Sequence, residues 1–365
     1  MLPTSLPGNG ASRRSVLAAG AALAAFCAFP LRLFARTVTD DLNRTVTLAE
    51  RPQRIVVADI YPFASLVAML LPQHQLVGIH PVSMSAAQKG LLGKVRPAVL
   101  KADTGFMRGS EINIELLLSL APDVVFVNAS NKRAVARLEA ASIPVVAVSA
   151  TQRDYDVFAT FRGWVTLLQG VFGDAVNAAA FNAAADRMTA LVNERTKDME
   201  PKDKKRVLFL VQYDERRMVT SGRRFFGQFW CEAARAENAA QAITAENAAA
   251  VINLEQVYAW NPDVIFLTNF TQAVPEDLYE NKWHDWSTVK AVQTRAVHKM
   301  PLGLYRSFTP SADSPLTLLW FAKTLYPERF ADLDMTKETI GYYKELFDFA
   351  LTPAQASDLF AVRQS

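Results

Sequence analysis

The sequence predicts an α/β protein made of two similar lobes with mostly parallel sheets, and two observations lead to this prediction. One stretch occurs twice: residues 112–130 read INIELLLSLAPDVVFVNAS and residues 252–270 read INLEQVYAWNPDVIFLTNF. Each copy has the pattern of a helix, a Pro-Asp corner and a buried strand. Strands also alternate with helical patterns along most of the chain, which is typical of parallel sheets covered on both faces. A long-period duplication of this kind indicates two similarly folded units.

The first 35 residues have the pattern of an export signal. The motif SRRSVL at 12–17 opens an apolar run that ends at Leu31, as in twin-arginine signal peptides. This run is shorter than the roughly 20 residues that a membrane-spanning helix needs. Lipid anchoring through Cys27 is not expected, because Phe26 before it is too bulky for lipoprotein processing. We therefore expect residues 1–35 to be a twin-arginine signal peptide and the mature protein to reside in the periplasm.

The mature chain is expected to be almost neutral. The 365 residues carry a formal net charge of +3, and loss of the signal removes three arginines and no acidic residue. A neutral chain has no electrostatic footprint for nucleic acid, so we expect none as a partner. Only Cys231 remains after cleavage, which excludes an intramolecular disulfide. The length fits two domains.

The first lobe is expected over residues 36–173. Pro62 forces the chain out of regular structure after the first strand. A polar loop at 101–110 then leads into the first copy of the repeat. The other expected elements are a strand at 54–58, a helix at 64–71, a strand at 76–79 and a strand at 143–148.

An alanine-rich helical stretch without strand signals separates the two lobes. It runs from Tyr155 to about Glu200, and we expect residues 174–200 to form a single helix that links the lobes. An ordinary helix within one lobe is the alternative. The second lobe, expected over residues 201–365, begins with a buried strand at 207–211.

The duplication extends to the first strand of each lobe. Arg54 stands seven residues before Tyr61, and Arg206 stands seven residues before Tyr213. Each tyrosine would then lie at the carboxyl end of an equivalent strand, where open α/β sheets bind ligands. A chance spacing of two tyrosines is the alternative.

Short motifs follow one another along the whole mature chain. Besides the Asn-x-Glu and Pro-Asp-Val of each repeat copy, they are DLNRTVT (41–47), PQRIV (52–56), TSG (220–222), FGQF (226–229), EN (237–238), the segment 286–297 and YPE (326–328). In this order they resemble the substrate-binding proteins of iron-siderophore, haem and vitamin B12 ABC importers. The resemblance implies two Rossmann-like lobes joined by a single long α-helix, with the ligand in a shallow cleft between lobes that hinge little. Asn43 and Arg235-Ala236 replace glycines that are usual in the family, so we expect those turns to differ.

The resemblance also implies a docking surface for the ABC permease subunits at the inner membrane. The family positions that carry the docking glutamates correspond to Glu115 and Glu255, each seven residues before the Pro of Pro-Asp-Val. Two separated carboxylates on equivalent faces can bind permease arginines. The alternative is stabilisation of a helix N-terminus, with Asn113 or Asn253 as the cap, and both roles can hold together.

The expected ligand is an iron(III) chelate of the siderophore type. Such a chelate usually carries net negative charge, so its receptor needs arginines for charge and aromatic rings for apolar contact. Residues of both kinds lie near predicted strand ends or in adjacent loops. The candidates are Tyr61, Arg108, Tyr213, Arg216, Arg223, Arg224, Phe270, Tyr305 and Arg306. For any single arginine, an ordinary solvated surface position is the alternative.

Direct binding of a metal ion by the protein is not expected. Zinc or manganese receptors need several histidines and carboxylates that converge, whereas the four histidines are scattered along the chain. Only His80 follows a strand closely enough to face the cleft, where it would complete the coordination of a chelate. Haem, cobalamin and nickel chelates stay open as alternatives.

An exported redox enzyme is the alternative from another class of function, because the twin-arginine route carries folded, cofactor-loaded enzymes. A lone Cys231 cannot hold an iron-sulfur cluster, and neither a nucleophile motif nor a glycine-rich dinucleotide fingerprint is present. We therefore expect a monomeric binding protein that is not an enzyme, has no permanently bound cofactor and delivers a small-molecule metal chelate to a permease. A sensor of the same fold is a third interpretation.

Overall fold

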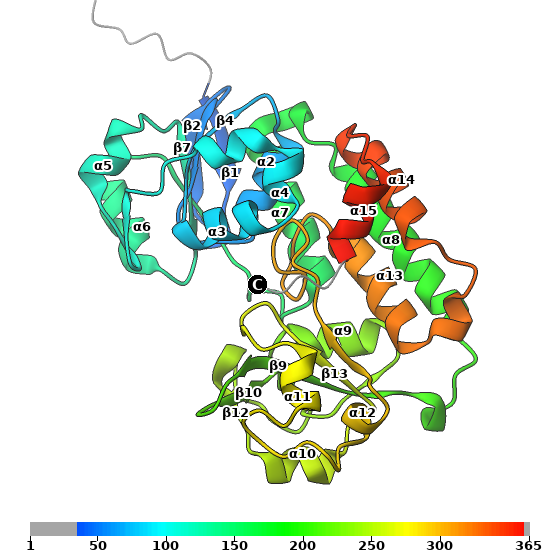
Figure 1. Cartoon of the computed structure of the whole chain (residues 1–365). Coiled ribbons are helices and arrows are strands. Elements are labelled where there is room, and N and C mark those ends of the chain that lie inside the picture. Colours follow the sequence, from blue (N-terminus) through cyan, green and yellow to red (C-terminus); the bar gives the residue numbers. More distant parts are fainter. Residues whose placement is uncertain (1–34, 361–365) are drawn as a thin grey trace, which may run out of the picture.

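A computed structural model describes residues 35–360 of the protein. These residues form two α/β lobes, with a layer of helices along one side of both (Figure 1). The expected signal peptide, apart from Ala35, lies outside the described residues. Within residues 35–360, no helix is both long enough and apolar enough to cross a membrane.

The N-terminal lobe contains a four-stranded parallel sheet with the strand order β4-β3-β7-β8. Its strands are β3 (Arg54–Val57), β4 (Gln75–Ile79), β7 (Val124–Asn128) and β8 (Val145–Val148). All of β8 is buried, as expected for a strand with both faces covered. The helices of this lobe are α2 (Phe63–Leu70), α3 (Pro81–Lys89), α4 (Leu92–Val95), α5 (Ile114–Ser119) and α6 (Lys132–Ala140), and a short hairpin of β5 (Met107–Arg108) and β6 (Glu111–Ile112) precedes α5.

The C-terminal lobe contains a mixed sheet with the path β12-β10-β9-β13-β14, and β11 pairs with β9. Its strands are β9 (Arg206–Tyr213), β10 (Met218–Thr220), β11 (Glu237–Asn238), β12 (Ala250–Val251), β13 (Val264–Leu267) and β14 (Val297–Lys299). The pairings of β10 with β9 and with β12 are antiparallel, and the other pairings in this sheet are parallel. The prediction of two lobes with mostly parallel sheets is therefore confirmed. The helices are α9 (Phe226–Ala233), α10 (Leu254–Trp260), α11 (Pro275–Tyr279) and α12 (Lys290–Gln293).

Helix α8 (Ala178–Thr196) leads from the N-terminal lobe to the C-terminal lobe, at the place where a linking helix is expected, and α7 (Val157–Phe172) precedes it. Three more helices cover them, namely α13 (Ser314–Leu325), α14 (Met335–Phe347) and α15 (Pro353–Phe360). Single 3₁₀ turns lie at Pro97–Lys101, Gly173–Ala175, Pro201–Asp203, Asn247–Ala249 and Pro327–Phe330. One cluster of buried apolar side chains runs from Phe126 in the first sheet through Phe181 in α8 to Phe209 in the second sheet. Because the lobes share this core, relative movement between them is restricted.

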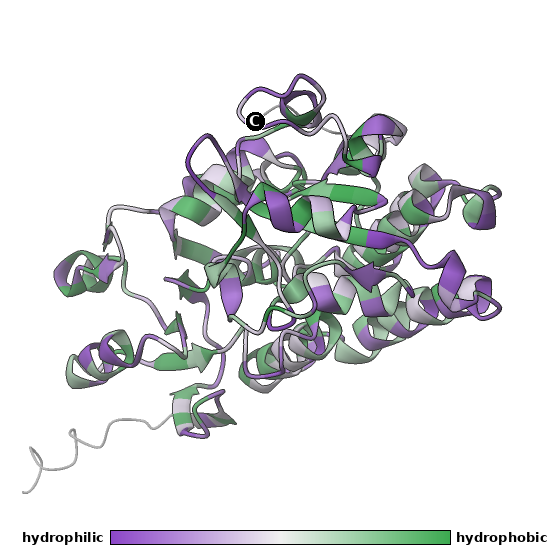
Figure 2. Ribbon diagram, turned by 90° about the horizontal axis from the view of Figure 1, so that it is seen from below, coloured by the Kyte–Doolittle hydropathy of each residue, from purple (hydrophilic) through white to green (hydrophobic). Residues whose placement is uncertain are grey.

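The C-terminal helices reach the first lobe as well as α8. Lys94 in α4 forms an ion pair with Asp358 in α15 at 2.9 Å, and the Arg96 guanidinium donates to the Phe347 carbonyl at 3.3 Å. The sequence places all of residues 201–365 in the second lobe, whereas these helices contact both lobes. Figure 2 shows the apolar strands at the centre of the molecule and polar segments on its outer helices.

The repeated residues hold equivalent corners of the two lobes. The Asp123 carboxylate accepts the backbone N–H of Arg54 at 2.9 Å, and Asp263 accepts that of Arg206 at 2.8 Å. The two guanidinium groups donate to the carbonyls of Leu120 and Trp260, which end the repeated helices. The aspartate of each Pro-Asp corner and the arginine that begins the first strand of each lobe are therefore structural. Together they join each repeat copy to that strand.

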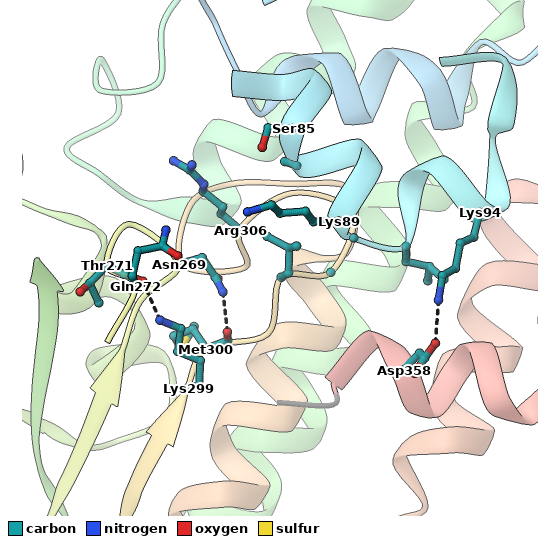
Figure 3. A pocket seen from close by; sticks show the side chains of 15 residues that line it. Ser85, Lys89, Lys94, Asn269, Thr271, Gln272, Lys299, Met300, Arg306 and Asp358 are labelled. Atoms are coloured by element: carbon teal, nitrogen blue, oxygen red, sulfur yellow. Dashed lines mark hydrogen bonds and ion pairs between the residues drawn. The ribbon is translucent and has the colours of Figure 1, made fainter. Parts of the chain in front are cut away.

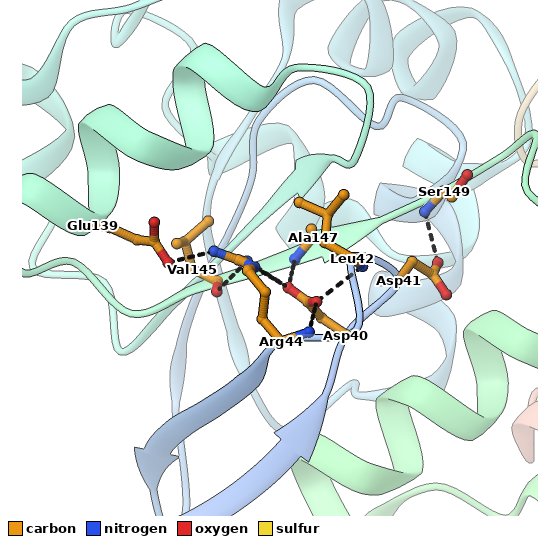
Figure 4. A network of polar contacts seen from close by, with 8 residues as sticks. All are labelled: Asp40, Asp41, Leu42, Arg44, Glu139, Val145, Ala147 and Ser149. Carbon is orange, nitrogen blue, oxygen red and sulfur yellow. Dashed lines mark hydrogen bonds and ion pairs between the residues drawn. The ribbon is translucent and has the colours of Figure 1, made fainter.

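The DLNRTVT motif anchors an additional hairpin, formed by β1 (Ala35–Thr39) and β2 (Thr45–Ala49), against β8. The buried carboxylate of Asp40 accepts the backbone N–H groups of Leu42, Arg44 and Ala147 (Figure 4). It also forms an ion pair with the Arg44 guanidinium, which contacts Glu139 in α6. This network joins Arg44 of the motif to Asp40, the residue directly before the motif, and to α6.

Two positions expected to form altered turns adopt the conformation that glycine favours. Asn43 has φ +59° and Arg235 has φ +55°. Asparagine tolerates this left-handed region, whereas arginine adopts it at a cost of roughly 1–2 kcal/mol. The replacement of the glycines therefore did not require a different backbone.

Candidate binding cleft

Loops that follow four parallel strands bring several of the predicted residues to the space between the lobes. The loops after β3, β4, β13 and β14 carry Tyr61, His80, Phe270 and Arg306, respectively. Ligands of open α/β sheets bind at this end of the strands. The lobes touch beside these loops, where the Leu91 N–H donates to the Gly303 carbonyl at 3.0 Å.

On the N-terminal lobe, the rings of Tyr61 and His80 pack with their centres 4.3 Å apart. The His80 Nδ1 accepts the N–H of Val82 at 3.0 Å and thereby caps α3. Burial lowers the pKa of His80, so the ring is neutral at pH 7 and its proton is on Nε2. The Nε2 atom is buried and has no hydrogen-bond partner within the described residues.

This protonation state bears on the expected role of His80 as a ligand of a chelated metal. A protonated Nε2 is a donor for an oxygen atom, whereas coordination of a metal needs a free lone pair. Metal ligation through Nε2 would therefore break the cap of α3. Across residues 35–360, no cluster of three or more His, Cys, Asp or Glu side chains is arranged to hold a metal ion.

On the C-terminal lobe, Arg306 lies over aromatic rings. Its guanidinium carbon is 4.8 Å from the centre of the Phe270 ring and 5.6 Å from that of Tyr305. The backbone of Arg306 has φ +32°, an uncommon value for a residue other than glycine and one that occurs at functional sites. Tyr305 is buried, which raises its pKa to about 12. Its hydroxyl is therefore neutral, and its ring packs against the Arg306 guanidinium.

The positive charge of Arg306 acts on Tyr61 of the opposite lobe. Burial and the nearby Asp59 raise the pKa of Tyr61, and the positive charge of Arg306 partly offsets this rise. The predicted residues Tyr61, His80, Phe270, Tyr305 and Arg306 therefore form one group that spans the cleft.

A cavity of about 320 Å³ lies between the lobes beside Arg306 (Figure 3). Helix α3 and the start of α4 line it on one side, and the loops after β13 and β14 line it on the other. Its cationic side chains are those of Lys89, Lys94, Lys299 and Arg306. Among the described residues that line the cavity, Asp358 is the one carboxylate, and it is paired with Lys94. The cavity therefore has a net positive charge, which favours an anionic ligand.

Lys299 holds the loop that carries Phe270. Its side chain is buried, and Nζ donates to the carbonyls of Thr271 and Ala273, each at 2.7 Å. Burial lowers the pKa of Lys299 to about 8, against the opposing effect of Asp277. Lys299 therefore loses its proton as the pH rises through about 8, and the positive charge of the cavity falls by one unit.

Tyr213 lies in the core of its lobe, away from solvent. Its hydroxyl accepts the indole N–H of Trp286 at 2.7 Å and is hydrogen-bonded to Nδ1 of His284 at 3.2 Å. It is 2% exposed, and burial raises its pKa to about 12. This position does not fit the ligand role expected from its equivalence with Tyr61, because its ring and hydroxyl are already enclosed by the protein.

The other predicted arginines lie at the surface. Arg108 in β5, Arg216 in the β9–β10 turn and Arg223 after β10 are exposed. Arg224 forms an ion pair with Glu246, so its charge is already partly neutralised.

Arg306 is the one polar residue of the cavity lining that sequence reasoning named; it missed the others, among them Lys89, Asn269 and Lys299. The Oδ1 atom of Asn269 is buried and has no hydrogen-bond partner within residues 35–360. The position of Lys299 at the end of a strand was a usable signal, since lysines that are buried usually have a specific partner or role.

The predicted docking glutamates occupy equivalent, exposed positions. Glu115 lies in the first turn of α5 and Glu255 in the first turn of α10. The side chain of Asn113 accepts the Leu116 N–H at 3.1 Å, and that of Asn253 accepts the Gln256 N–H at 2.9 Å. The asparagines therefore cap both helices, and the carboxylates remain accessible.

Two lobes with a shared core and a cationic cavity between them define a two-lobed binding protein. The chain belongs to the periplasmic binding protein family of ABC importers: the family profile described as "Periplasmic binding protein" matches residues 73–302. This match confirms the prediction, made from the order of the motifs, that the chain is a substrate-binding protein of the ABC importer type.

The relatives include proteins of different ligand specificity. The molybdate-binding protein MolA of Haemophilus influenzae is 29% identical over 349 residues, which cover 88% of this chain and 93% of MolA. The solved structure of MolA bound to molybdate has a TM-score of 0.74 at 25% identity and covers 87% of this chain and 99% of MolA. A periplasmic solute binding protein from Veillonella parvula has a TM-score of 0.78 at 24% identity, with coverage of 90% and 97%. Helicobacter pylori CeuE in complex with Ni-His has a TM-score of 0.71 at 22% identity, with coverage of 90% and 100%.

Proposed function

We propose that this protein captures a compact, anionic metal species between its lobes and delivers it to an ABC permease. The observation that carries the proposal is the cavity of about 320 Å³ with four cationic side chains and one carboxylate. This volume is at the lower end of the roughly 300–1,000 Å³ typical of small-molecule sites, so it suits a metal oxyanion better than haem. Molybdate is the first ligand to test, because the relative MolA is described as molybdate-binding.

The cationic side chains come from both lobes, so a ligand that binds them contacts both lobes at once. Lys89 lies at the end of α3 in the first lobe, and Arg306 lies in the second. A bound anion would relieve the repulsion between these groups and accept charge-assisted hydrogen bonds from both. Ligand binding is therefore expected to favour the arrangement in which the two lobes are held together.

An iron(III) chelate, the ligand predicted from the sequence, is the second candidate. The aromatic faces of Tyr61 and Phe270 favour it, because they lie beside the same cation and can contact the organic part of a chelate. Haem, cobalamin and nickel chelates are weaker alternatives of the same fold. In each case the ligand is cargo rather than a permanent cofactor, and the receptor acts as a monomer.

Parallel titrations would separate these ligands, with the intrinsic fluorescence of the six tryptophans as the signal. The ligands are molybdate, tungstate, a ferric catecholate, a ferric hydroxamate, nickel-histidine, haem and cobalamin, with sulfate as the control anion. We expect saturable quenching by molybdate or tungstate. Saturation only by a ferric chelate would establish the second candidate, whereas tight binding of cobalamin alone would contradict an anion site. A cofactor absorption band in the freshly purified protein would instead support the exported redox enzyme.

We also propose that the chain reaches the periplasm by the twin-arginine route and docks onto permease arginines through Glu115 and Glu255. The exposed positions of both carboxylates in equivalent helices support this docking role. Replacement of Arg13 and Arg14 by lysine should leave the precursor in the cytoplasm. Export of this variant at the normal level would contradict the assigned route.

A further inference from the structure

Large apolar side chains that remain exposed are concentrated beside the two docking glutamates. Among residues 35–360 these side chains are Leu100, Leu116, Leu118, Val251 and Tyr258. All except Leu100 lie within four residues of Glu115 or Glu255. Single exposed apolar residues are common, but this distribution follows the duplicated unit.

Two of these side chains occupy the same position in the two repeat copies. Leu118 stands three residues after Glu115, and Tyr258 stands three residues after Glu255. Residues three apart on a helix lie on one face. Helices α5 and α10 therefore each present a carboxylate and an apolar side chain next to each other, at the periphery of different lobes (Figure 1).

The buried sides of the two helices are anchored at equivalent positions as well. Leu117 and Val257, which also correspond in the repeat, are both completely buried. Leu118 is 50% exposed and Tyr258 is 39% exposed, so these apolar groups are only partly used in the packing of their lobes. The Tyr258 hydroxyl donates to the Asp285 carbonyl at 2.5 Å, which holds the ring in a defined orientation at the surface.

We infer that Glu115 with Leu118, and Glu255 with Tyr258, form two matched docking pads that bind the two permease subunits of the importer. The inference rests on the proposed function, and it adds an apolar contact to each carboxylate. Two equivalent pads on one chain fit a partner that presents two equivalent surfaces, each with a cation for the glutamate and an apolar site beside it. An arginine of the partner can bind such a pad with its whole side chain. Its methylene groups pack against the apolar residue while its guanidinium pairs with the carboxylate.

The test measures binding of the full mature chain to the cognate permease complex in nanodiscs. The double variant L118S/Y258S keeps both glutamates, and we expect it to bind the permease about tenfold more weakly or worse, as for loss of central interface contacts. L100S changes an exposed leucine outside the pads and should bind as the unchanged chain does. Molybdate titration and thermal unfolding establish that each variant is folded and loaded.

The outcomes separate the pads from the docking role itself. Normal permease binding by L118S/Y258S, together with loss of binding by E115A/E255A, would overturn the apolar pads and leave the proposed function intact. Normal binding by both double variants would overturn docking through these helices altogether. A concentration-dependent dimer of the unchanged chain that L118S/Y258S abolishes, seen by sedimentation, would assign the pads to a second copy and overturn the permease as occupant.

Discussion

The guanidinium carbon of Arg306 lies 4.8 Å from the centre of the Phe270 ring. The two residues belong to loops that follow adjacent parallel strands, β13 and β14. The ring face attracts the cation and orients it before any ligand is present. Arg306 is therefore positioned beside the cavity by the sheet itself, with little freedom to be lost on binding.

Replacement of Phe270 by leucine should weaken binding of an anionic ligand by about two- to thirtyfold, because a cation–π contact contributes about 0.5–2 kcal/mol. Phe270→Tyr keeps the ring face and should bind as the unchanged protein does. Fluorescence titration with molybdate measures both variants. Equal weakening in the two variants would show that the ring positions the ligand by shape rather than by holding Arg306.

The affinity for an anion should fall as the pH rises through about 8. Burial lowers the pKa of Lys299 to about 8, so its charge is present in the folded protein below this pH and lost above it. Removal of one unit charge beside the ligand is expected to weaken binding by about tenfold. The pKa of His80 is lowered by burial, so its titration lies below this range.

Lys299→Met should remove this pH step and bind weakly throughout. The step cannot be assigned to unfolding, because an amine with a depressed pKa makes the folded state relatively more stable as pH rises above about 8. Calorimetric titration with molybdate between pH 7 and pH 9.5 would measure it, since molybdate keeps its charge over that range. An unchanged step in Lys299→Met would assign the titration to another group.

Replacement of both Glu115 and Glu255 by alanine should abolish uptake while ligand affinity stays unchanged. The carboxylates lie on α5 and α10, outside the residues that line the cavity. Glu276→Ala removes an exposed carboxylate from the first turn of α11 and serves as the control. Uptake of radiolabelled molybdate by cells gives the measurement. A loss of affinity in the double variant would contradict the docking role.

Asp40→Ala should destabilise the protein by about 3 kcal/mol, because it leaves the partner cation and several N–H groups without their acceptor. The carboxylate accepts three backbone N–H groups and pairs with Arg44. Urea unfolding followed by circular dichroism measures the change. Glu139→Ala removes only the exposed partner of Arg44 and should change stability by about 1 kcal/mol or less. Equal losses in the two variants would contradict the central role of Asp40.

The sequence predicted the lobes well because apolar runs and the duplicated unit are local signals. The strand expected at 54–58 corresponds to β3, and the helix expected over 174–200 corresponds to α8. The Asp40–Arg44 turn was visible only as a motif, because the backbone N–H groups that donate to its aspartates, those of Ala147 and Ser149, lie about a hundred residues away in the sequence.

The site was only partly predictable for a physical reason. Position after a strand gave the same expectation for Tyr61, Arg306 and Tyr213, but Tyr213 lies enclosed in the core of its lobe. The fate of Tyr213 depends on Trp286 and His284, which enclose its hydroxyl from a distant segment. The cavity lysines were missed because their positions follow from how α3 meets the loop after β14, a contact that no local pattern encodes.

The central claim is that an anion binds between the lobes at Arg306, and calorimetric titration of Arg306→Gln with molybdate tests it most directly. Arg216→Gln, which removes an exposed arginine from the β9–β10 turn, is the matched control. We predict that Arg306→Gln weakens binding by about a hundredfold, as expected for loss of a charge-assisted contact to the ligand, and that Arg216→Gln binds normally. Equal affinity of the two variants for molybdate would contradict the account.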